Sequence, residues 1–381
     1  MGAQGGPNDP LLSVGSISAM TEQPTDTRGV IFDGPGRMPR VEELFLDPPR
    51  WGEVLVRMAA AGVCHSDLHV RDGEWERPAG IVIGHEGAGW VEELGEGVEG
   101  LERGDLVVLA WTAPCRQCDA CRRDEPWLCS QPAGSGHRLR DEDVRLRRAT
   151  GEPVGAYGGI GTFGQHQVVA ASAAIRIDRR TPPEIAALIG CAVTTGIGAV
   201  RNTARVEAEE SLTIIGLGGV GLSAVMGAVA QDAHPVTAID TSPAKLELAA
   251  QSGAHRTLLA SEAQQSAGAD HVLECIGLVE TVELAIDLVR PGGTVTLVGM
   301  TAQGHRASFD VYRLVEDGKR INGSNYGSAD PATDFPRIAR EYLDGRLPLD
   351  LLITERIGLE QLDDAFAALR RGDGARRVIV Y

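Results

Sequence analysis

The stretch LTIIGLGGVG occupies residues 212–221 and decides the fold of this chain. Its first four residues predict a buried strand, and the loop Gly216–Gly221 matches the pattern G-x-G-x-x-G ahead of an apolar helix. In that setting Gly216 permits a tight turn, Gly218 lets a pyrophosphate approach the backbone, and Gly221 lets the helix pack on the strand. Free N–H groups at the helix start, from Gly219 onward, attract phosphates. The stretch therefore predicts a dinucleotide-binding unit.

Strands and helices alternate beyond this loop. Strands are expected at Val236–Asp240, His271–Cys275 and Thr294–Gly299, and helices at Val220–Gln231, Pro243–Ser252 and Val279–Val289. This rhythm predicts a parallel sheet covered on both faces. A carboxylate at Asp240 would bind both ribose hydroxyls and repel a 2′-phosphate, which favours NAD over NADP. Lys245, one of two lysines, would reach the same ribose; a loop acid and a solvated lysine are the alternatives.

The regions on either side of this unit have a different sequence pattern. Short strand-like runs separated by Gly, Pro and Asp predict an irregular β domain over residues 27–171. Amphipathic helices are expected at Phe335–Leu343 and Leu359–Arg370, followed by a strand at Arg377–Tyr381. The segment His137–Val154 is highly charged without periodicity, so we expect an exposed loop there.

Length and charge narrow the class of protein. A chain of 381 residues predicts two domains, and the net charge of −17 argues against a nucleic-acid partner. Residues 1–20 have neither a basic start nor a long apolar core, so we expect a tail, ending near residue 26, and no secretory signal; Met20 is an alternative start. The apolar run Leu212–Ala230 has the length of a membrane span, but its glycines favour a strand, a turn and a buried helix.

Four of the seven cysteines are crowded together, with the spacing Cys115-x2-Cys118-x2-Cys121-x7-Cys129. Four thiolates can close around one tetrahedral Zn²⁺, which leaves no open position, so the site should be structural. The binding energy would order a loop that lacks a core. An iron–sulfur cluster, disulfides and free thiols are the alternatives. The odd cysteine count favours a reducing compartment, and we expect the cytoplasm.

A second group of metal-binding residue types is spread along the chain. It comprises Cys64 and His65 within residues 64–69, His85 with Glu86, and Cys191. Two cysteines and one histidine from separate segments would supply three zinc ligands and leave the fourth position for water or substrate. From the residues alone, small buried core cysteines and a surface His–Glu pair remain the alternatives.

These motifs, in this order, resemble those of the zinc-dependent medium-chain alcohol dehydrogenases. The matching segments are residues 62–67, 84–89 and 190–196, the four cysteines, and the glycine loop with Asp240. The resemblance spans about Arg28 to Tyr381 and is nearest the long-loop branch that includes glutathione-dependent formaldehyde dehydrogenases and actinobacterial-type alcohol dehydrogenases. It implies an α/β fold. A GroES-like, mostly-β catalytic domain is expected at residues 27–192 and 326–381, with the zinc lobe at about 111–130, and a doubly wound Rossmann domain at 193–325.

The resemblance also implies a catalytic centre. Cys64, His85 and Cys191 would hold catalytic zinc, and Glu86 would approach the metal during ligand exchange. An alkoxide would form on the zinc, and hydride would then pass to NAD.

Further roles follow from the same resemblance. Ser66 and His69 would relay the alcohol proton, and Asp67 would orient His85. A helix cap, an exposed histidine and a first-turn helix acid are the respective alternatives. Contacts to the cofactor are implied for His65, Thr195, Val220, Val298 and Arg376, with Arg377 adjacent. The substrate pocket would include Trp75, Trp111 and Met300, although ordinary packing is the alternative for the tryptophans.

We therefore expect an NAD-dependent alcohol dehydrogenase or aldehyde reductase with two zinc ions per subunit, acting on primary or aromatic alcohols. One rival is a thiol-dependent formaldehyde dehydrogenase that acts on an S-hydroxymethyl thiol adduct. Another is an enzyme that keeps its nicotinamide tightly bound between turnovers. A rival of a different class is an inactive nucleotide-binding relative. A homodimer through the sheets near Thr294–Met300 is expected, with a tetramer as the alternative.

Overall fold

The computed structural model describes residues 23–134, 137–139 and 143–381. Most of the expected tail, including Met20, lies outside the described residues. Strand β1 (Thr25–Phe32) begins before residue 26, where the tail was expected to end. That boundary was wrong, because Thr25 and Asp26 already pair with residues of β2 (Arg40–Leu46).

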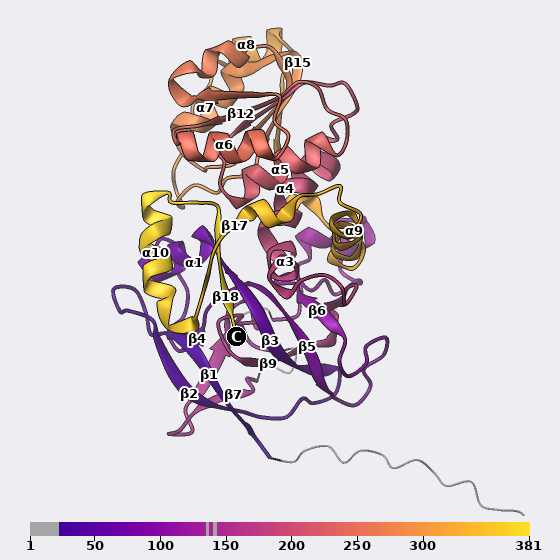
Figure 1. Ribbon diagram of the computed structural model, residues 1–381, viewed down its shortest axis with the longest axis vertical. Coiled ribbons are helices and arrows are strands. Elements are labelled where there is room, and N and C mark those ends of the chain that lie inside the picture. The colour runs from indigo at the N-terminus through magenta and orange to yellow at the C-terminus, as the bar shows by residue number, and fades with distance from the viewer. Residues whose placement is uncertain (1–22, 135–136, 140–142) are drawn as a thin grey trace, which may run out of the picture.

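The upper half of the molecule in Figure 1 is built on a parallel sheet with the strand order β13-β12-β11-β14-β15-β16. Helices α5 (Gly219–Val229), α6 (Pro243–Gln251) and α7 (Val279–Leu288) connect its strands. The predicted α/β class is confirmed here. The strands are β11 (Leu212–Ile215), β12 (Val236–Asp240), β13 (Arg256–Leu259), β14 (Ala269–Glu274), β15 (Val289–Leu297) and β16 (Arg320–Gly323). Sequence reasoning missed β13 and β16, because these edge strands are short and largely exposed.

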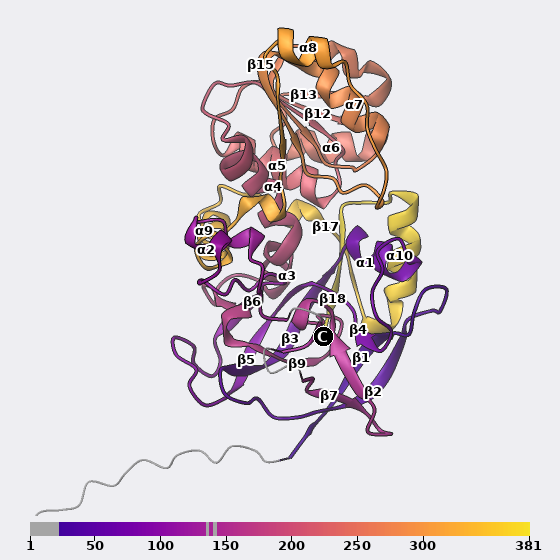
Figure 2. The ribbon, with the colours of Figure 1, turned by 180° about the vertical axis from the view of Figure 1, so that it is seen from behind.

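The lower half combines a closed barrel, β1-β2-β7-β8-β4, with a mixed sheet in the order β10-β6-β5-β3-β18-β17, and β9 also pairs with β3. Figures 1 and 2 show the C-terminal strand β18 returning beside β3. Chain ends far apart in sequence therefore build one unit. The remaining strands are β3 (Glu53–Val63), β4 (Ile81–Val82), β5 (Glu86–Leu94), β6 (Leu106–Leu109), β7 (Leu146–Arg148), β8 (Pro153–Ala156), β9 (His166–Ala170), β10 (Ala174–Arg176), β17 (Ile353–Ile357) and β18 (Arg376–Val380).

The charged segment His137–Val154 was wrongly expected to be an exposed loop. Its described part contains β7 and the start of β8, which complete the barrel. The Arg145 guanidinium is buried and makes two hydrogen bonds to Glu53, of 2.6 and 2.9 Å. A buried, bidentate ion pair explains how such a polar sequence enters the interior.

A continuous helix, Pro183–Ala204, lies between the two halves and carries Cys191. It is apolar and long enough to cross a membrane, but 83% of its most apolar window is buried inside the protein. It begins with Pro183 at its first position, where no N–H is lost, and ends at Arg205 in the left-handed region, with φ 54°. Cys191 sits in a π-helical turn, Ile189–Val193. The other suspected span, Leu212–Ala230, divides into β11 and α5.

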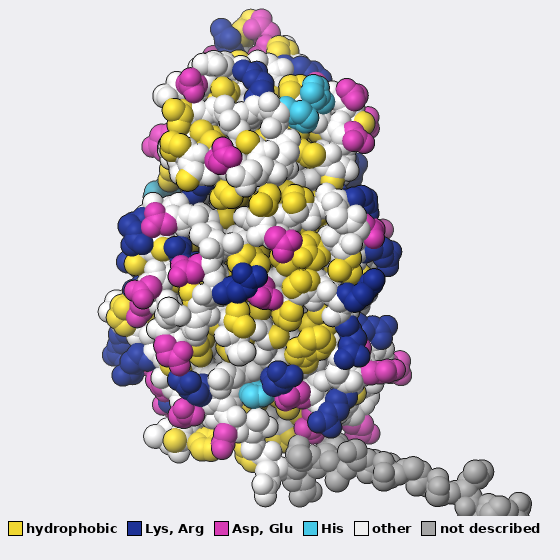
Figure 3. All heavy atoms as spheres, viewed as in Figure 1, with side chains coloured by type: hydrophobic (Ala, Val, Ile, Leu, Met, Phe, Trp, Pro, Cys, Tyr) yellow, Lys and Arg dark blue, Asp and Glu magenta, His cyan; other side chains and the backbone are white. Residues whose placement is uncertain are grey.

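Seven further helices complete the described part of the chain, and one of them, α8, buries none of its residues. They are α1 (His65–Asp72), α2 (Asp119–Arg122), α3 (Pro183–Leu188), α4 (Thr194–Gly198), α8 (Val311–Glu316), α9 (Pro331–Leu343) and α10 (Leu362–Arg371). In Figure 3, cationic and acidic side chains are interspersed over the visible face, so the net charge of −17 does not concentrate into one acidic field there.

Candidate active site

The first candidate ligand, Cys64, stands where β3 ends and α1 begins. It is the N-cap residue of α1, and its N–H donates to Oδ2 of Asp67 at 3.1 Å. The other oxygen of Asp67 lies 2.8 Å from Nδ1 of His85. One buried carboxylate therefore fixes both a strand-to-helix turn and the orientation of the imidazole. This arrangement also leaves Nε2 of His85 free to face the centre of the site.

Three segments of the chain bring a set of four metal-ligand residues together. Cys64, His85, Glu86 and Cys191 are all buried, and their ligand atoms lie within 4.8 Å of one another. Nε2 of His85 and both carboxylate oxygens of Glu86 have no hydrogen-bond partner among the described residues. Unpartnered buried polar atoms are costly, and a metal ion would satisfy them. Two sulfurs and one imidazole are the ligand types that zinc prefers.

The two thiols of this group, Cys64 and Cys191, have pKa values that are shifted in opposite directions. The pKa of the Cys64 thiol lies well below its usual value. The largest cause is a hydrogen bond from Cys191, and the charge of Arg376 acts in the same direction, while burial opposes both. The same interaction raises the pKa of Cys191. Metal binding at these two sulfurs would be accompanied by proton release.

Arg376 lies between this group and the glycine loop. Its Nη2 is 3.6 Å from Sγ of Cys64, and its Nε is 3.5 Å from Oε1 of Glu86. A Cβ built on Gly219 would stand 2.5 Å from Cζ of Arg376, so the guanidinium abuts the phosphate-binding turn. Burial raises the pKa of Glu86 to about 7, while the charge of Arg376 opposes that rise. Sequence reasoning expected Arg376 near the pyrophosphate but did not foresee its contact with Glu86.

The predicted relay residues lie on α1. Ser66 is half-buried, and His69 places Nδ1 2.6 Å from Oε2 of Glu74. The ring of Trp75 stacks on His69 with centroids 5.0 Å apart. Trp75 was expected to line the substrate pocket; the structure places it against the outer end of the predicted relay.

The glycine loop has the conformation that the motif predicts. Gly216 has φ 92°, which places the turn in the left-handed region. Oδ2 of Asp240 accepts from the Leu217 N–H at 2.8 Å, and Oδ1 accepts from the Ser242 N–H at 2.9 Å. The carboxylate therefore lies at the end of β12, beside the loop, and it is 9% exposed.

Other predicted cofactor contacts surround this loop. Val220, in the first turn of α5, lies against Gly196, the residue after Thr195, because a Cβ built on Gly196 would stand 2.2 Å from the Val220 carbonyl. Val298 follows β15 and donates its N–H to the Glu274 carbonyl at 2.8 Å.

Cationic groups also converge near the loop. Burial lowers the pKa of His65, and the charges of Arg376 and Lys245 act in the same direction. The charges of Arg376 and Lys245 therefore both reach His65, beside the turn that would bind an anionic cofactor.

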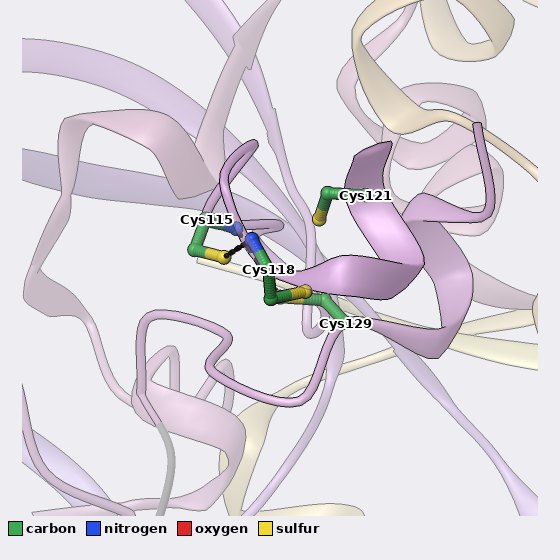
Figure 4. A group of neighbouring side chains, drawn as sticks. All are labelled: Cys115, Cys118, Cys121 and Cys129. Carbon is green, nitrogen blue, oxygen red and sulfur yellow. Dashed lines mark hydrogen bonds between the residues drawn. The ribbon is translucent and has the colours of Figure 1, made fainter. Parts of the chain in front are cut away.

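The four cysteines of the lobe point toward one centre, as Figure 4 shows. Their sulfur atoms lie within 4.8 Å of one another, and all seven cysteines of the chain are free thiols. The disulfide alternative is therefore wrong. Backbone N–H groups of Cys115 and Cys118 donate to Sγ of Cys129 and Cys115, at 3.2 and 3.3 Å. Backbone donors, that of Cys121 first, lower the pKa of Cys118 to about 5. This lobe therefore has the donor set of a closed metal site.

The aromatic side chains near the site include two that sequence reasoning missed. The ring of Trp111 lies 4.4 Å from that of Tyr326, and Tyr157 meets His85 edge-on with centroids 5.8 Å apart. Neither tyrosine belongs to a recognisable motif, so the sequence offered no signal for them. Met300 is 62% exposed, and Cys275, expected to be a buried thiol, is only half-buried.

Comparison with known proteins identifies the family. Two family models match, the alcohol dehydrogenase GroES-like domain over residues 50–179 and the zinc-binding dehydrogenase domain over residues 219–343. The chain belongs to the zinc-dependent medium-chain alcohol dehydrogenases, a family of oxidoreductases that act on alcohols or aldehydes.

Particular relatives cover nearly the whole chain. An S-(hydroxymethyl)glutathione dehydrogenase of Photobacterium damsela subsp. piscicida is 34% identical, over 93% of this chain and all of the relative. Two crystal structures are also similar. One is an alcohol dehydrogenase zinc-binding domain protein from Burkholderia ambifaria, with TM-score 0.90, 32% identity and coverage of 94% of this chain and 99% of the other. The second is benzyl alcohol dehydrogenase from Acinetobacter calcoaceticus, with TM-score 0.88, 29% identity and coverage of 93% and 99%.

Proposed function

We propose that this protein oxidises primary or aromatic alcohols, and reduces the corresponding aldehydes, with NAD and a catalytic zinc ion. The observation that carries the proposal is the buried group formed by Cys64, His85, Glu86 and Cys191, with unpartnered ligand atoms and with Arg376 connecting it to the glycine loop. In this reading Cys64, His85 and Cys191 hold the metal, and one coordination position is left for the alcohol oxygen.

Bound zinc would supply Lewis acidity toward an alcohol oxygen, and NAD would accept the hydride. The chain's own residues prepare the site for both. Asp67 accepts from the His85 ring and the Cys64 N–H, which fixes the imidazole with Nε2 facing inward. Glu86, whose pKa burial raises to about 7, is held by Arg376 near the two sulfurs, from where it can exchange with a bound ligand.

The alcohol proton needs a path out of a buried site. Ser66 and His69 are three positions apart on α1 and therefore share one side of the helix. In our proposal the Ser66 hydroxyl accepts the alcohol proton as it gives up its own, and the released proton reaches His69 near the surface. The Glu74 carboxylate lies 2.6 Å from Nδ1 of His69 and orients its ring.

The cofactor would lie across the glycine loop. Gly216–Gly221 and the first turn of α5 would hold the pyrophosphate, with Arg376 adding positive charge and His65 as a further contact. Asp240 and Lys245 would bind the adenosine ribose, and the Asp240 carboxylate would disfavour NADP. Thr195, Val220 and Val298 would surround the nicotinamide.

The lobe formed by the four cysteines would hold a second, structural zinc ion. Trp111 and Met300 are proposed to contribute to the substrate pocket, together with Tyr157.

Thiolate ligands at both sites favour a reducing compartment, so we place the protein in the cytoplasm.

The expected dimer contact is revised. Within the expected region Thr294–Met300, the strand β15 is interior to the sheet, because it pairs with both β14 and β16. β16 is one of the two edge strands, with β13 at the other edge, and α8, which precedes β16 in the chain, exposes Val311, Tyr312 and Val315 by 64%, 71% and 74%. We propose that this apolar face and the β16 edge form the homodimer interface.

A second candidate function has support from the relatives named S-(hydroxymethyl)glutathione dehydrogenase. A thiol adduct of glutathione carries carboxylates. The described chain offers a cation for such a group, Arg77, whose guanidinium lies 5.6 Å from the Tyr157 ring centroid beside the metal ligand His85.

A substrate panel separates the two functions. Benzyl alcohol, short alcohols and formaldehyde, the last with and without glutathione, are assayed with NAD and with NADP. The proposal predicts turnover of benzyl alcohol with NAD and no thiol requirement. A strict thiol requirement would select the second candidate, and no turnover of any substrate would favour an inactive nucleotide-binding relative. Nicotinamide absorbance in dialysed protein would indicate a retained cofactor.

A further inference from the structure

Tyr326 makes a buried contact with the segment that carries the proposed ligand Cys191. Its side chain is 2% exposed, and its hydroxyl donates to the carbonyl of Gly190 at 2.5 Å. Gly190 directly precedes Cys191 inside the π-helical turn Ile189–Val193. A π turn departs from the regular hydrogen-bond pattern of an α-helix, so that pattern alone does not fix its backbone. An added hydrogen bond at this turn therefore has a larger effect on the backbone position. The phenol is therefore placed to hold the backbone from which Cys191 projects.

The segment around Tyr326 is held in an unusual conformation. Tyr326, Gly327 and Ser328 have φ of 54°, 65° and 49°, three consecutive residues in the left-handed region. Non-glycine residues rarely occupy this region unless the surroundings impose it. A Cβ on Gly327 would stand 2.6 Å from the Thr194 carbonyl, so the turn is pressed against the Cys191-bearing helix.

Side chains of the same helix secure the turn. The Thr203 hydroxyl lies 2.8 Å from the hydroxyls of both Ser324 and Ser328, and the Asn202 amide donates to the Gly327 carbonyl at 3.2 Å. These bonds impose the strained backbone, and the strained backbone aims Tyr326 at Gly190. Such over-determination is typical of segments that act on a functional site.

The turn is also tied to the four-cysteine lobe. Arg116, between Cys115 and Cys118, makes a bidentate pair with Asp330, with hydrogen bonds of 2.6 and 2.7 Å. The Asn325 amide donates to the carbonyl of Trp127 at 3.2 Å. The ring of Tyr326 itself packs 4.4 Å from that of Trp111, which precedes the lobe. A continuous set of contacts therefore runs from the lobe, through residues 324–330, to Cys191.

We propose that Tyr326 is a positioning residue that aligns Cys191 at the proposed catalytic metal site and couples that site to the four-cysteine lobe. The inference rests on the proposed function only in requiring a metal at Cys64, His85 and Cys191. It does not depend on which alcohol is the substrate.

The test uses Tyr326→Phe in the full-length protein, because phenylalanine keeps the ring and removes only the hydroxyl. The matched control is Tyr342→Phe, which removes a hydroxyl bonded to Asp350 at 3.2 Å, on an exposed surface. Three quantities are measured: the rate at which zinc passes to a chromogenic chelator, the thiolate-to-metal absorption of the Co²⁺-substituted protein, and kcat with KM. Thermal unfolding is followed in parallel.

For Tyr326→Phe we expect zinc release from one of the two sites to accelerate and kcat to fall, each by about 10- to 100-fold. The cobalt spectrum should shift, and KM for NAD should change less than threefold. Tyr342→Phe should leave all of these values unchanged. A lower melting temperature with unaltered metal release, cobalt spectrum and kcat would show that Tyr326 is merely structural, and would overturn the proposal.

The coupling has a separate test, which also serves if Tyr326→Phe does not fold. Arg116→Gln breaks the bidentate pair with Asp330 at a distance from Cys191, and it should shift the same cobalt bands with a smaller effect on kcat. In the double variant the two effects should be less than multiplicative, because they act through the same turn. An unshifted spectrum in Arg116→Gln would overturn the coupling. Wild-type protein that binds metal at this site but oxidises no alcohol would refute the proposed function and leave this inference measurable.

Discussion

The substitution Asp67→Asn tests the organisation of the proposed metal site. Asp67 is fully buried, with one oxygen 2.8 Å from Nδ1 of His85 and the other accepting from the Cys64 N–H at 3.1 Å. Asparagine has the same shape, but one of its two ends is a donor. A carboxylate can face two donors at once, whereas an amide cannot.

Each orientation of the amide has a definite cost. If the NH2 group faces His85, Nδ1 must lose its proton, Nε2 acquires one, and the lone pair that would bind a metal is lost. If it faces Cys64, a buried backbone N–H is left unpaired, at a cost of about 1–3 kcal/mol. That cost corresponds to a factor of about 5 to 150, and substitutions of groups that orient metal ligands typically reduce affinity or activity by about 10- to 100-fold. We expect zinc affinity and kcat/KM to fall within this range.

The assay is zinc retention against graded chelator, with kcat/KM for alcohol oxidation measured in parallel. The control is Asp363→Asn, another acid in the first turn of a helix, whose side chain is 48% exposed. If Asp67→Asn lowers only the melting temperature of the metal-free protein and leaves zinc retention and kcat/KM within twofold, then Asp67 merely caps α1. That outcome would refute the reasoning.

Three other substitutions test other parts of the account. Asp240→Asn should raise the ratio of kcat/KM for NADP over NAD by about tenfold or more, because the like-charge repulsion with a 2′-phosphate is removed; an unchanged ratio in steady-state kinetics would count against the ribose role. Glu53→Gln should lower the free energy of unfolding by about 3 kcal/mol, because it breaks the buried pair with Arg145; denaturant unfolding that changes by under about 1 kcal/mol would disagree. Burial raises the pKa of Glu86 from 4.5 to about 7. In metal-free protein the contribution of Glu86 to the free energy of unfolding is therefore full below pH 4.5 and is lost as the pH rises toward 7. The loss amounts to about 3 kcal/mol at most, and Glu86→Gln should flatten that dependence; unfolding curves with the same pH slope in both proteins would be the contrary result.

Features encoded by short spacings were predictable from the sequence. The glycine loop, the four cysteines and most helices and strands of the Rossmann unit depend on neighbouring residues, so their patterns survive without tertiary context. The strand Val236–Asp240 and the start of the helix at Val279 agree with the structure residue for residue.

Features that depend on distant partners were not predictable. The charges of the segment His137–Val154 indicated a loop, because nothing local shows that Arg145 meets Glu53 across the barrel. The contact of Arg376 with Glu86 and the bond from Tyr326 to Gly190 likewise join residues far apart in the chain. The ligand set at Cys64, His85 and Cys191 followed only from the family resemblance, since each of these residues alone has an ordinary structural explanation.

Metal counting on wild-type protein and on Cys64→Ser, with alcohol oxidation assayed on the same samples, tests the central claim most directly. The account predicts two zinc ions per subunit in the wild type. It predicts one in Cys64→Ser, with turnover reduced by at least about 100-fold, while Cys275→Ser, which alters a thiol outside both groups, keeps both ions and full activity. A Cys64→Ser protein that retains two zinc ions or turns over alcohol within about tenfold of the wild-type rate would contradict the assignment of the catalytic site.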